Sequence, residues 1–396
     1  MKRILSFVMV CVSVLCLASC SWDVDEPELP VVTTPFASGE DFLDQLQNKE
    51  GTKYEPTSKS SMHSELAVGD GVFFFKYSKK NWPIIYNPAT DQAHYMCFDP
   101  SCTHKYNRCL ANMLIVTNYY CYDGDDLYCL YRHRYVGQDT QSGLARISRD
   151  GSELEMLHRM DTTGLTNMQA GGGYVFLTKH KEIYRYDIAK NEMKILSQDG
   201  LYINSYIATD KGLILHTNSV GVRYTDHDLK LIKKICKVGK ILYSNEKLYH
   251  VIYTREDDGE TIKTAQIWQY DMATDQDRMI AEVNSFSDVL CANDEYFYYS
   301  TSQTGSGYSY RGKGIGRINI ATGEQSIFFE HKDLTPVQMY CVNGEYYGCM
   351  QATANYDCWL TPKLLNTEIF GKFTDADGNG QYEFKPFQWD ISVFEN

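Results

Sequence analysis

One unit of structure recurs along most of this chain and constrains its fold more than any other feature. From about residue 64, an apolar strand leads into a tight turn of Gly, Asp or Asn and then into an aromatic-rich strand, as in Gly171-Gly172-Gly173 before Tyr174-Val175-Phe176. Seven such second strands begin at residues 72, 127, 174, 213, 248, 296 and 346, so neighbouring copies lie 35 to 55 residues apart. Repeats of this length are typical of the four-stranded blades of a β-propeller.

The second half of each unit agrees with this interpretation. Short segments alternate apolar and polar residues and then stop at an Asp or Asn turn, as in Ile183–Ala189 and Ile267–Thr274. This pattern is expected of a third blade strand. A two-sheet sandwich is the alternative, but sandwiches do not repeat this regularly. The sequence therefore predicts an all-β fold, a β-propeller of six or seven four-stranded antiparallel blades.

The N-terminus resembles an export signal. An apolar run from Ile4 to Leu17 is too short to span a bilayer as a helix and fits the central region of a signal peptide. The segment that follows, Leu17-Ala18-Ser19-Cys20, resembles the lipobox of bacterial lipoproteins, which implies cleavage before Cys20 and a lipid on its thiol. A secretory signal that happens to end in Cys is the alternative. We therefore expect residues 1–19 to be a lipoprotein signal peptide and the protein to be extracytoplasmic, anchored to a bacterial membrane.

Residues 20–61 are predicted to be a tether. This stretch is acidic and polar and cannot bury enough apolar surface to fold alone. Within it, Phe42 and Leu46 are one helical turn apart and predict a short helix over Glu40–Asn48. The propeller is expected to occupy residues 62–396.

A cluster of cysteines between the first two units is the sharpest local motif. Three thiols and one imidazole within 13 residues could close a tetrahedral zinc site, although the spacing matches no standard zinc motif. Disulfides are the favoured alternative because the domain is expected to be exported, and the odd number of thiols would then require a partner such as Cys121 or Cys129. Under either interpretation this element is a structural cross-link (a staple) rather than a reaction centre. Its residues are Cys97, Cys102, His104 and Cys109.

The remaining cysteines are expected to be small buried side chains rather than ligands. Their distance from the tight turns predicts which strand of each unit carries them. Cys121, Cys291 and Cys341 should lie on first strands, and Cys129 and Cys349 on second strands.

The chain resembles a known group of bacterial propellers. Its Tyr-Asp-x-Ala-Thr strands are similar to those of TolB-like propellers. Its lipobox, Tyr-rich units and Cys-x-Asp-Pro-x-Cys-x-His element resemble surface propeller lipoproteins of clostridial gut bacteria. The resemblance covers residues 60–396. It implies a fold and a surface location and carries no activity.

Three long loops are predicted between second and third strands, over residues 132–143, 255–264 and 303–314. They should share one face of the propeller with the blade connectors, and rigid scaffolds tend to carry function on such loops. The third loop is basic and aromatic, which favours contact with a sugar or a protein. A solvated loop without a ligand is the alternative. The candidate contact residues are Tyr308, Tyr310, Arg311 and Lys313.

A string near the C-terminus matches the start of a calcium-binding loop. Asp375, Asp377 and Asn379 occupy its first three ligand positions, but Pro386 stands where a bidentate Glu is required. A turn between third and fourth strands is therefore favoured, and calcium is disfavoured.

Composition and motifs narrow the function to two classes. Lys+Arg 38 against Asp+Glu 51 gives a net charge of -13, which excludes a general nucleic-acid binder. The sequence contains no nucleophile elbow, zinc-protease helix or phosphate-binding loop, so we identify no catalytic residues. The favoured class is a monomeric, non-catalytic surface module that binds a glycan, peptide or envelope protein. The alternative is a glycan lyase or hydrolase with a site assembled from several blades.

Overall fold

The computed structural model describes the larger part of the chain. The described residues are 32–34, 59–60, 66–69, 72–77, 82–97, 120–123, 126–133, 141–147, 154–179, 182–197, 202–217, 220–236, 239–255, 262–301, 312, 314–332, 334–342, 344–352, 368–375, 378 and 380–389.

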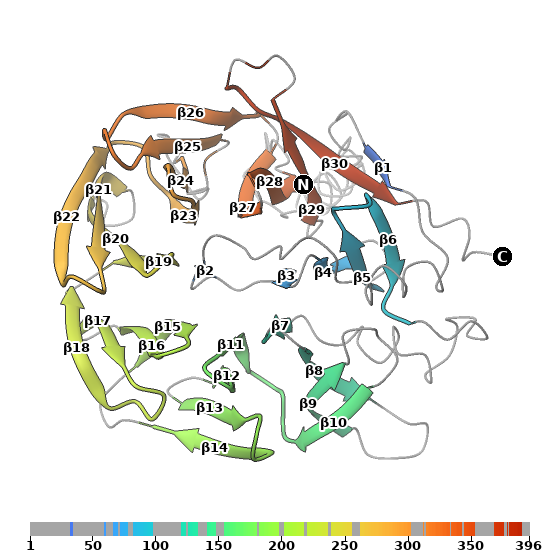
Figure 1. Ribbon diagram of the computed structural model, residues 1–396. Helices are drawn as coiled ribbons and strands as arrows, with labels where there is room; N and C mark the ends of the chain where they lie inside the picture. The colour runs from blue at the N-terminus through green and yellow to red at the C-terminus, as the bar shows by residue number, and fades with distance from the viewer. Residues whose placement is uncertain are drawn as a thin grey trace, which may run out of the picture.

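Seven antiparallel sheets stand in a ring around a central axis (Figure 1). The predicted all-β propeller is thereby confirmed, and the choice between six and seven blades is decided as seven. The first three blades are formed by β3 (Leu66–Gly69), β4 (Val72–Tyr77), β5 (Trp82–Asn87) and β6 (Gln92–Tyr95); by β7 (Tyr120–Tyr122), β8 (Leu127–His133), β9 (Gln141–Ile147) and β10 (Leu154–Arg159); and by β11 (Thr166–Gly171), β12 (Tyr174–Lys179), β13 (Glu182–Asp187) and β14 (Glu192–Leu196).

The other four blades follow in chain order. They are formed by β15 (Ile203–Thr209), β16 (Gly212–Thr217), β17 (Gly221–Thr225) and β18 (Leu231–Cys236); by β19 (Lys240–Ser244), β20 (Lys247–Arg255), β21 (Ile262–Asp271) and β22 (Gln276–Val283); by β23 (Asp288–Ala292), β24 (Tyr296–Ser300), β25 (Gly314–Asn319) and β26 (Gln325–Glu330); and by β27 (Leu334–Val342), β28 (Glu345–Ala352), β29 (Glu368–Thr374) and β30 (Glu383–Trp389).

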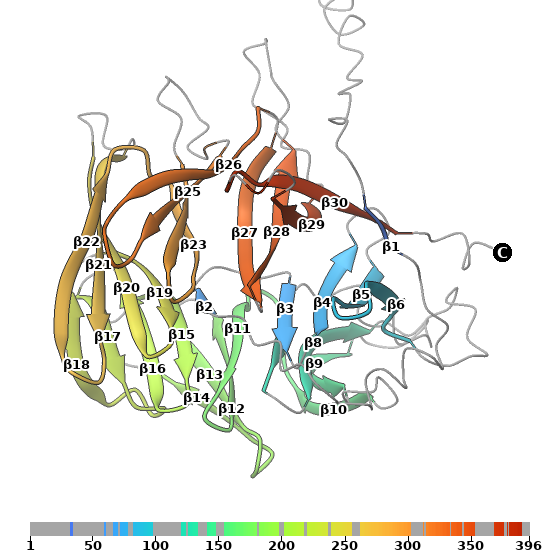
Figure 2. The ribbon, with the colours of Figure 1, turned by 45° about the horizontal axis from the view of Figure 1, so that its top comes forward.

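Each blade is built from four consecutive strands, with the first strand nearest the axis and the fourth at the rim (Figures 1 and 2). Two short strands from the segment predicted as a tether add to this plan. β1 (Val32–Thr34) pairs with β30 at the rim of blade 7, and β2 (Lys59–Ser60) pairs with β19 at the inner edge of blade 5. The helix predicted over residues 40–48 lies outside the described residues.

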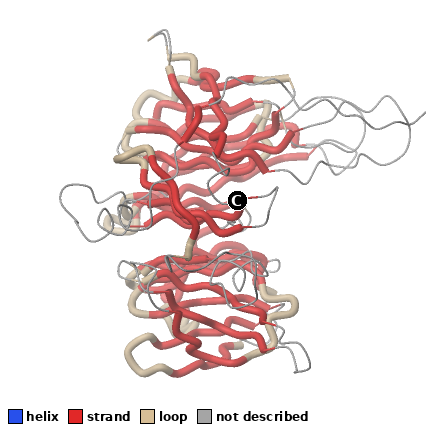
Figure 3. The backbone as a smooth tube through the Cα atoms, turned by 90° about the vertical axis from the view of Figure 1, so that its right-hand side faces the viewer, coloured by secondary structure: helices blue, strands red, loops and turns tan. Residues whose placement is uncertain are grey.

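The core lies between the blades. Each second strand is covered by a neighbouring blade on both faces, so successive side chains are buried whichever way they point. Leu213, Ile214 and Leu215 of β16 are all 0% exposed. This explains why the second strands are near-continuous apolar runs in the sequence. Fourth strands at the rim such as β18, β22 and β26 instead carry mostly exposed or half-buried residues. Strands make up nearly all of the described chain, with short turns at their ends (Figure 3).

Within the described residues, no helix has the length and the apolar character needed to cross a bilayer.

Candidate functional site

Most residues singled out from the sequence lie outside the part of the chain that the structure describes. These are Cys20, Cys102, His104, Cys109, Tyr308, Tyr310, Arg311, Lys313, Asp377 and Asn379. Cys97 is described and lies just beyond β6 with its side chain buried. The choice between zinc and disulfides in the Cys/His element therefore remains a prediction. Among the described residues, no group of three or more His, Cys, Asp and Glu side chains is arranged to hold a metal ion.

Asp375 lies where the sequence places it, in the connection between the third and fourth strands of blade 7. Its Oδ2 accepts a hydrogen bond from the backbone N–H of Gly380 at 2.8 Å. Gly378 and Gly380 have φ values of 66° and 80°, which favour glycine. Asp375 thus forms part of a turn, as the sequence favoured.

The cysteine placements are confirmed strand by strand. Cys121, Cys291 and Cys341 lie on the first strands β7, β23 and β27, and Cys129 and Cys349 lie on the second strands β8 and β28. All five side chains are buried, from 0% to 8% exposed. Burial raises the pKa of the Cys129 and Cys291 thiols, which makes them poor nucleophiles and poor metal ligands.

The repeated Tyr-Asp-x-Ala segments form one recurring turn. In blade 3, Asp187 Oδ1 accepts the backbone N–H of Lys190 at 3.0 Å, while Asn191 adopts φ 55° and accepts the hydroxyl of Tyr186 at 2.7 Å. The tyrosine hydroxyl makes the same bond to Asp91 in blade 1 and to Asp275 in blade 5. The carboxylates of this repeat are therefore occupied in shaping turns.

Blade 6 differs from blades 1, 3 and 5 at both positions of this bond. Ile318 replaces the tyrosine there, and Gly323, with φ 76°, replaces the Asp or Asn in the left-handed position. A side chain without a hydroxyl leaves nothing for an acceptor to bind, and glycine adopts the left-handed conformation at least cost.

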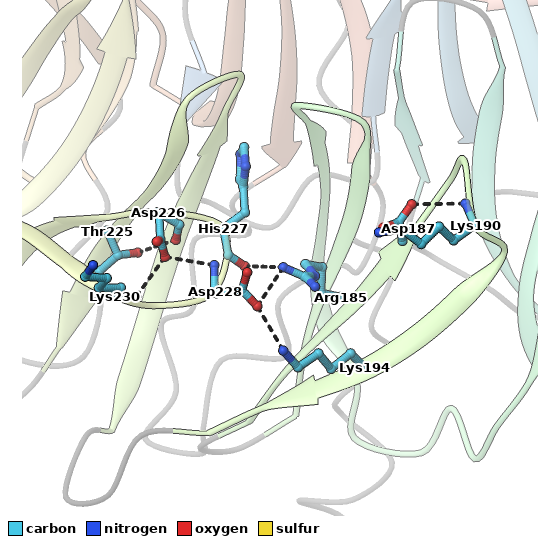
Figure 4. A network of polar contacts seen from close by, with 9 residues as sticks. All are labelled: Arg185, Asp187, Lys190, Lys194, Thr225, Asp226, His227, Asp228 and Lys230. Carbon is cyan, nitrogen blue, oxygen red and sulfur yellow. Dashed lines mark hydrogen bonds and ion pairs between the residues drawn. The ribbon is translucent and has the colours of Figure 1, made fainter.

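A network of polar contacts joins blades 3 and 4 (Figure 4). Arg185 of β13 donates from Nη1 to the backbone oxygen of His227 at 3.0 Å and pairs with Asp228 Oδ1 at 3.0 Å. Lys194 of β14 approaches the same carboxylate oxygen at 2.9 Å. The guanidinium of Arg185 lies 4.6 Å from the ring centre of Tyr174 and is almost fully buried. An arginine held by carbonyl, carboxylate and aromatic face together is fixed in one conformation.

The turn of blade 4 that contacts Arg185 is held in place by hydrogen bonds of its own. Asp226 Oδ1 accepts the backbone N–H groups of Asp228 at 2.9 Å and Lys230 at 2.8 Å, while Leu229 adopts φ 65° with its side chain buried. These hydrogen bonds fix the turn so that the His227 oxygen and the Asp228 carboxylate face blade 3.

His227 itself is seated on the glycine turn of blade 3. Its Nε2 donates to the backbone oxygen of Thr209 at 3.0 Å, and its ring stacks on Phe176 with 5.8 Å between centres. Gly172, with φ 60°, lies directly beneath the ring, and a Cβ built there would come 2.3 Å from His227 Cε1. Gly172, the middle residue of the glycine triplet, is therefore needed to make room for a side chain of the next blade.

Related contacts recur at other blade junctions. Arg278 of blade 5 donates to the backbone oxygen of Ile320 in the corresponding turn of blade 6, at 3.2 Å. Arg317 of blade 6 lies against the corresponding turn of blade 7, where a Cβ on Gly380 would be 3.0 Å from its Nη2. A contact that repeats around the ring supports the ring itself, whereas a ligand site in a single chain need occur only once. We therefore assign Arg185 and its partners to the inter-blade contacts.

The described carboxyl groups with shifted pKa values are all shifted downward. A hydrogen bond from Lys194 lowers the pKa of Asp228, and one from Lys190 lowers that of Asp187. A hydrogen bond from Lys247 brings the pKa of Asp271 to about 2, and one from the backbone of Thr163 does the same for Asp161. For Glu345, burial raises the pKa but the hydrogen bonds from Lys372 and Tyr347 outweigh it. A catalytic acid needs the opposite shift, because it must keep its proton near neutral pH.

One buried histidine lies apart from these contacts. His250 of β20 is 1% exposed, stacks on Trp268 with 6.2 Å between ring centres, and has Nε2 at 3.2 Å from both oxygens of Asp277. Burial lowers its pKa, against the attraction of the Asp277 carboxylate. The imidazole is thus neutral at neutral pH, and its place within a blade fits packing better than catalysis.

The sequence analysis missed the Arg185 contact, although a signal for it was present. When the third strands are aligned on their closing turns, one position is cationic in five blades, as Arg146, Arg185, Arg223, Arg317 and Lys372. That column identifies a recurring cationic position of the third strands. The partners of Arg185, which lie about 40 residues away in the next blade, become visible only in the folded ring; Arg146 and Lys372 instead pair within their own blades.

Comparison with known proteins assigns the chain to no family. No family model matches the chain, and no curated protein matches its sequence. Similar solved structures include the β-propeller domain of the Trilobed protease from Pyrococcus furiosus, with TM-score 0.46 and 10% identity over 68% of this chain and 82% of that one. The xyloglucanase from Xanthomonas campestris has TM-score 0.46 and 9% identity over 80% of this chain and 55% of that one. A nidogen/laminin complex has TM-score 0.35 and 13% identity over 72% and 88%. The β-propeller fold alone does not distinguish an enzyme from a binding protein.

Proposed function

We propose that the protein is a lipid-anchored extracytoplasmic propeller that binds a glycan, peptide or envelope protein without catalysing a reaction. The observation that carries the absence of catalysis in this proposal is the way in which the carboxylates of the described polar clusters are bound. Their carboxylates are held ionised by Lys, Arg and backbone N–H partners that build turns and blade junctions. Groups bound in this way are not poised to transfer protons.

The long loops supply the binding face in this proposal. They connect β8 to β9, β20 to β21 and β24 to β25, each of which is a second-to-third-strand connection, as predicted from the sequence. In an antiparallel blade these connections lie at the same end as the connectors between blades, so they share one face. Tyr308, Tyr310, Arg311 and Lys313 of the third loop are the proposed contact residues.

Binding and catalysis can be separated in one experiment. Purified residues 21–396 are incubated with isolated peptidoglycan sacculi and, separately, with pectic oligosaccharides; bound protein is measured by sedimentation or calorimetry and product by mass spectrometry. Saturable binding with unchanged substrate mass is expected. Turnover of either substrate would instead favour the lyase or hydrolase alternative.

The loop assignment has its own control. Replacing residues 303–311 by Gly and Ser should abolish binding while leaving the thermal midpoint within a few degrees. A matched replacement of Asp294→Gly, in a tight turn at the opposite end of blade 6, should leave binding unchanged. Loss of binding in both variants would place the contact elsewhere.

The anchor is proposed at Cys20 and is tested independently of the ligand. Expression of the full chain in a bacterial host should yield an N-terminal peptide that begins at Cys20 and carries acyl chains in mass spectrometry. Cys20→Ser should release the protein from the membrane fraction. An unmodified peptide starting elsewhere would show an ordinary secreted protein.

The Cys/His element is proposed as a staple beside the binding face. Native mass spectrometry of the exported, non-reduced protein distinguishes its two forms. A mass excess of one zinc ion that disappears in His104→Ala indicates a metal site. A deficit of about two mass units per bridge with no metal indicates disulfides.

A further inference from the structure

The N-terminal segment is docked on the propeller at two separated places. β1 runs parallel to β30, with Val32 opposite Phe387 and Thr34 opposite Trp389, at the rim of blade 7. β2 runs antiparallel to β19, with Lys59 opposite Tyr243, near the axis of the ring (Figures 1 and 2). A segment paired by its backbone at both places cannot act as one long free spacer.

Docking at β1 changes how far the propeller can move from an anchor at Cys20. Only twelve peptide steps separate Cys20 from Val32. A chain of that length spans at most roughly 40 Å when fully extended. If the whole segment up to Leu66 were free, its 46 steps would span roughly 150 Å.

The charged residues of the segment 21–31 are all of one sign. This stretch carries four carboxylates, two prolines and no Lys or Arg. Like charges repel each other along a linker, and proline stiffens it. Residues 21–31, the leader, contain no pair of opposite charges.

We infer that β1 is the mechanical attachment point of the propeller and that the leader holds the rim of blade 7 toward the lipid surface, within roughly 40 Å. The outer strands of blades 3 and 4, across the ring from blade 7 in Figure 1, are then the most distant from the membrane. This inference rests on the proposed lipid anchor at Cys20. It assigns an orientation to the protein and a partner, the bilayer surface, to one side of its rim.

The orientation can be measured by Förster resonance energy transfer from a dye on the protein to a dye on the membrane surface. The lipidated full chain is reconstituted on phosphatidylcholine vesicles that contain an acceptor dye on lipid headgroups. A donor dye is attached through an azide-bearing amino acid, which avoids the native cysteines, at exposed Glu383 of β30 or at exposed Glu192 of β14. Transfer from position 383 should exceed transfer from position 192 by roughly twofold or more, because only the former stays within reach of the short leader.

Two insertions form the matched test of β1 as the attachment point. About twenty Gly and Ser residues, a length that behaves as a flexible coil, are inserted either after Ser21 or after Lys49. The first insertion lengthens the leader and should remove the difference between positions 383 and 192. The second lies between β1 and β2 and should leave the difference intact.

The outcomes separate this inference from the proposed function. Equal transfer from the two positions in the parent protein, or an equal effect of the two insertions, would overturn the attachment at β1 while leaving the anchor in place. A chain that does not associate with vesicles at all would overturn the anchor itself. Thermal midpoints of the two insertion variants report whether each still folds.

Discussion

The junction between blades 3 and 4 and the junction between blades 6 and 7 solve the same packing problem with different chemistry. The first adds to its apolar core a set of directed polar contacts from Arg185, His227 and Gln169, whose side-chain amide bonds to Tyr206 O at 3.0 Å and to Ala208 N at 2.9 Å. The second is chiefly aromatic. Its rings are Tyr298, Phe328, Tyr346, Phe373 and Tyr382.

Because of this difference, the two junctions should respond to different perturbations. The burial of aromatic rings is driven mainly by the non-directional hydrophobic effect and depends on filled volume, so it responds to truncation and little to salt or pH. Polar contacts depend on geometry and ionisation, so they respond to backbone strain, charge removal and acid. The predictions below use these sensitivities, measured as changes in the free energy of unfolding in urea.

Removing a ring from the aromatic junction should have the largest effect. Phe328 is 0% exposed and lies with its ring centre 4.2 Å from Tyr382 and 5.0 Å from Tyr346. Phe328→Ala should lower the free energy of unfolding by about 4 kcal/mol, because it removes apolar contacts and leaves a cavity. Its neighbour Ile327, 49% exposed, is the control, and Ile327→Ala should cost less than about 0.5 kcal/mol.

Adding a methyl group to the glycine turn of the polar junction should lower the free energy of unfolding somewhat less than Phe328→Ala does. Gly172→Ala combines a left-handed backbone with a Cβ inside the His227 ring position, for a cost of about 3 kcal/mol. Gly173, with φ 82° and no atom within 4 Å of a built Cβ, is the matched control at about 1 kcal/mol. In a His227→Ala background the difference between the two glycine variants should shrink but not vanish, because a Cβ at Gly172 would also come 2.8 Å from the backbone oxygen of Asp210. An unchanged difference would mean that His227 is not the obstacle.

Removing the buried cation should cost about 2 kcal/mol. Arg185→Met keeps an unbranched chain over Tyr174 but loses the charge-assisted bond to the His227 oxygen. Lys194→Met removes the other, 59% exposed cation from the same carboxylate and should cost less than about 0.5 kcal/mol. Equal losses in the two variants would show that the Asp228 charge, rather than the carbonyl contact, holds the junction.

Acid should weaken the polar junction by the smallest amount. The pKa of Asp228 is lower in the folded protein than its ordinary value of 3.8, so its contribution is present above about pH 4 and is lost as the pH falls through the folded value. The carboxylate is 56% exposed, so screening should limit the effect to less than about 1 kcal/mol. The stability difference between the parent protein and Asp228→Asn should shrink from pH 6 to pH 3. Tyr298→Phe, in the aromatic junction, should show a difference that does not change over this range.

The sequence by itself determined the blade plan. The strand placement of Cys121 and Cys349, the loops between second and third strands, and the turn that contains Asp375 all follow from local patterns that repeat with the blade. Such patterns are readable because burial on both faces of a second strand, or a left-handed turn position, restricts the residue types at each position.

Only the tertiary structure decided the number of blades, the docking of β1 and β2, and the pairing of Arg185 with His227. Each depends on closing the ring, which brings together residues from different blades or from opposite ends of the chain. β1 and β2 are three and two residues long, so their pairing depends on an available strand edge rather than on a local pattern. The role of Gly172 is decided in the same way, because the atom that forbids a Cβ there belongs to the next blade.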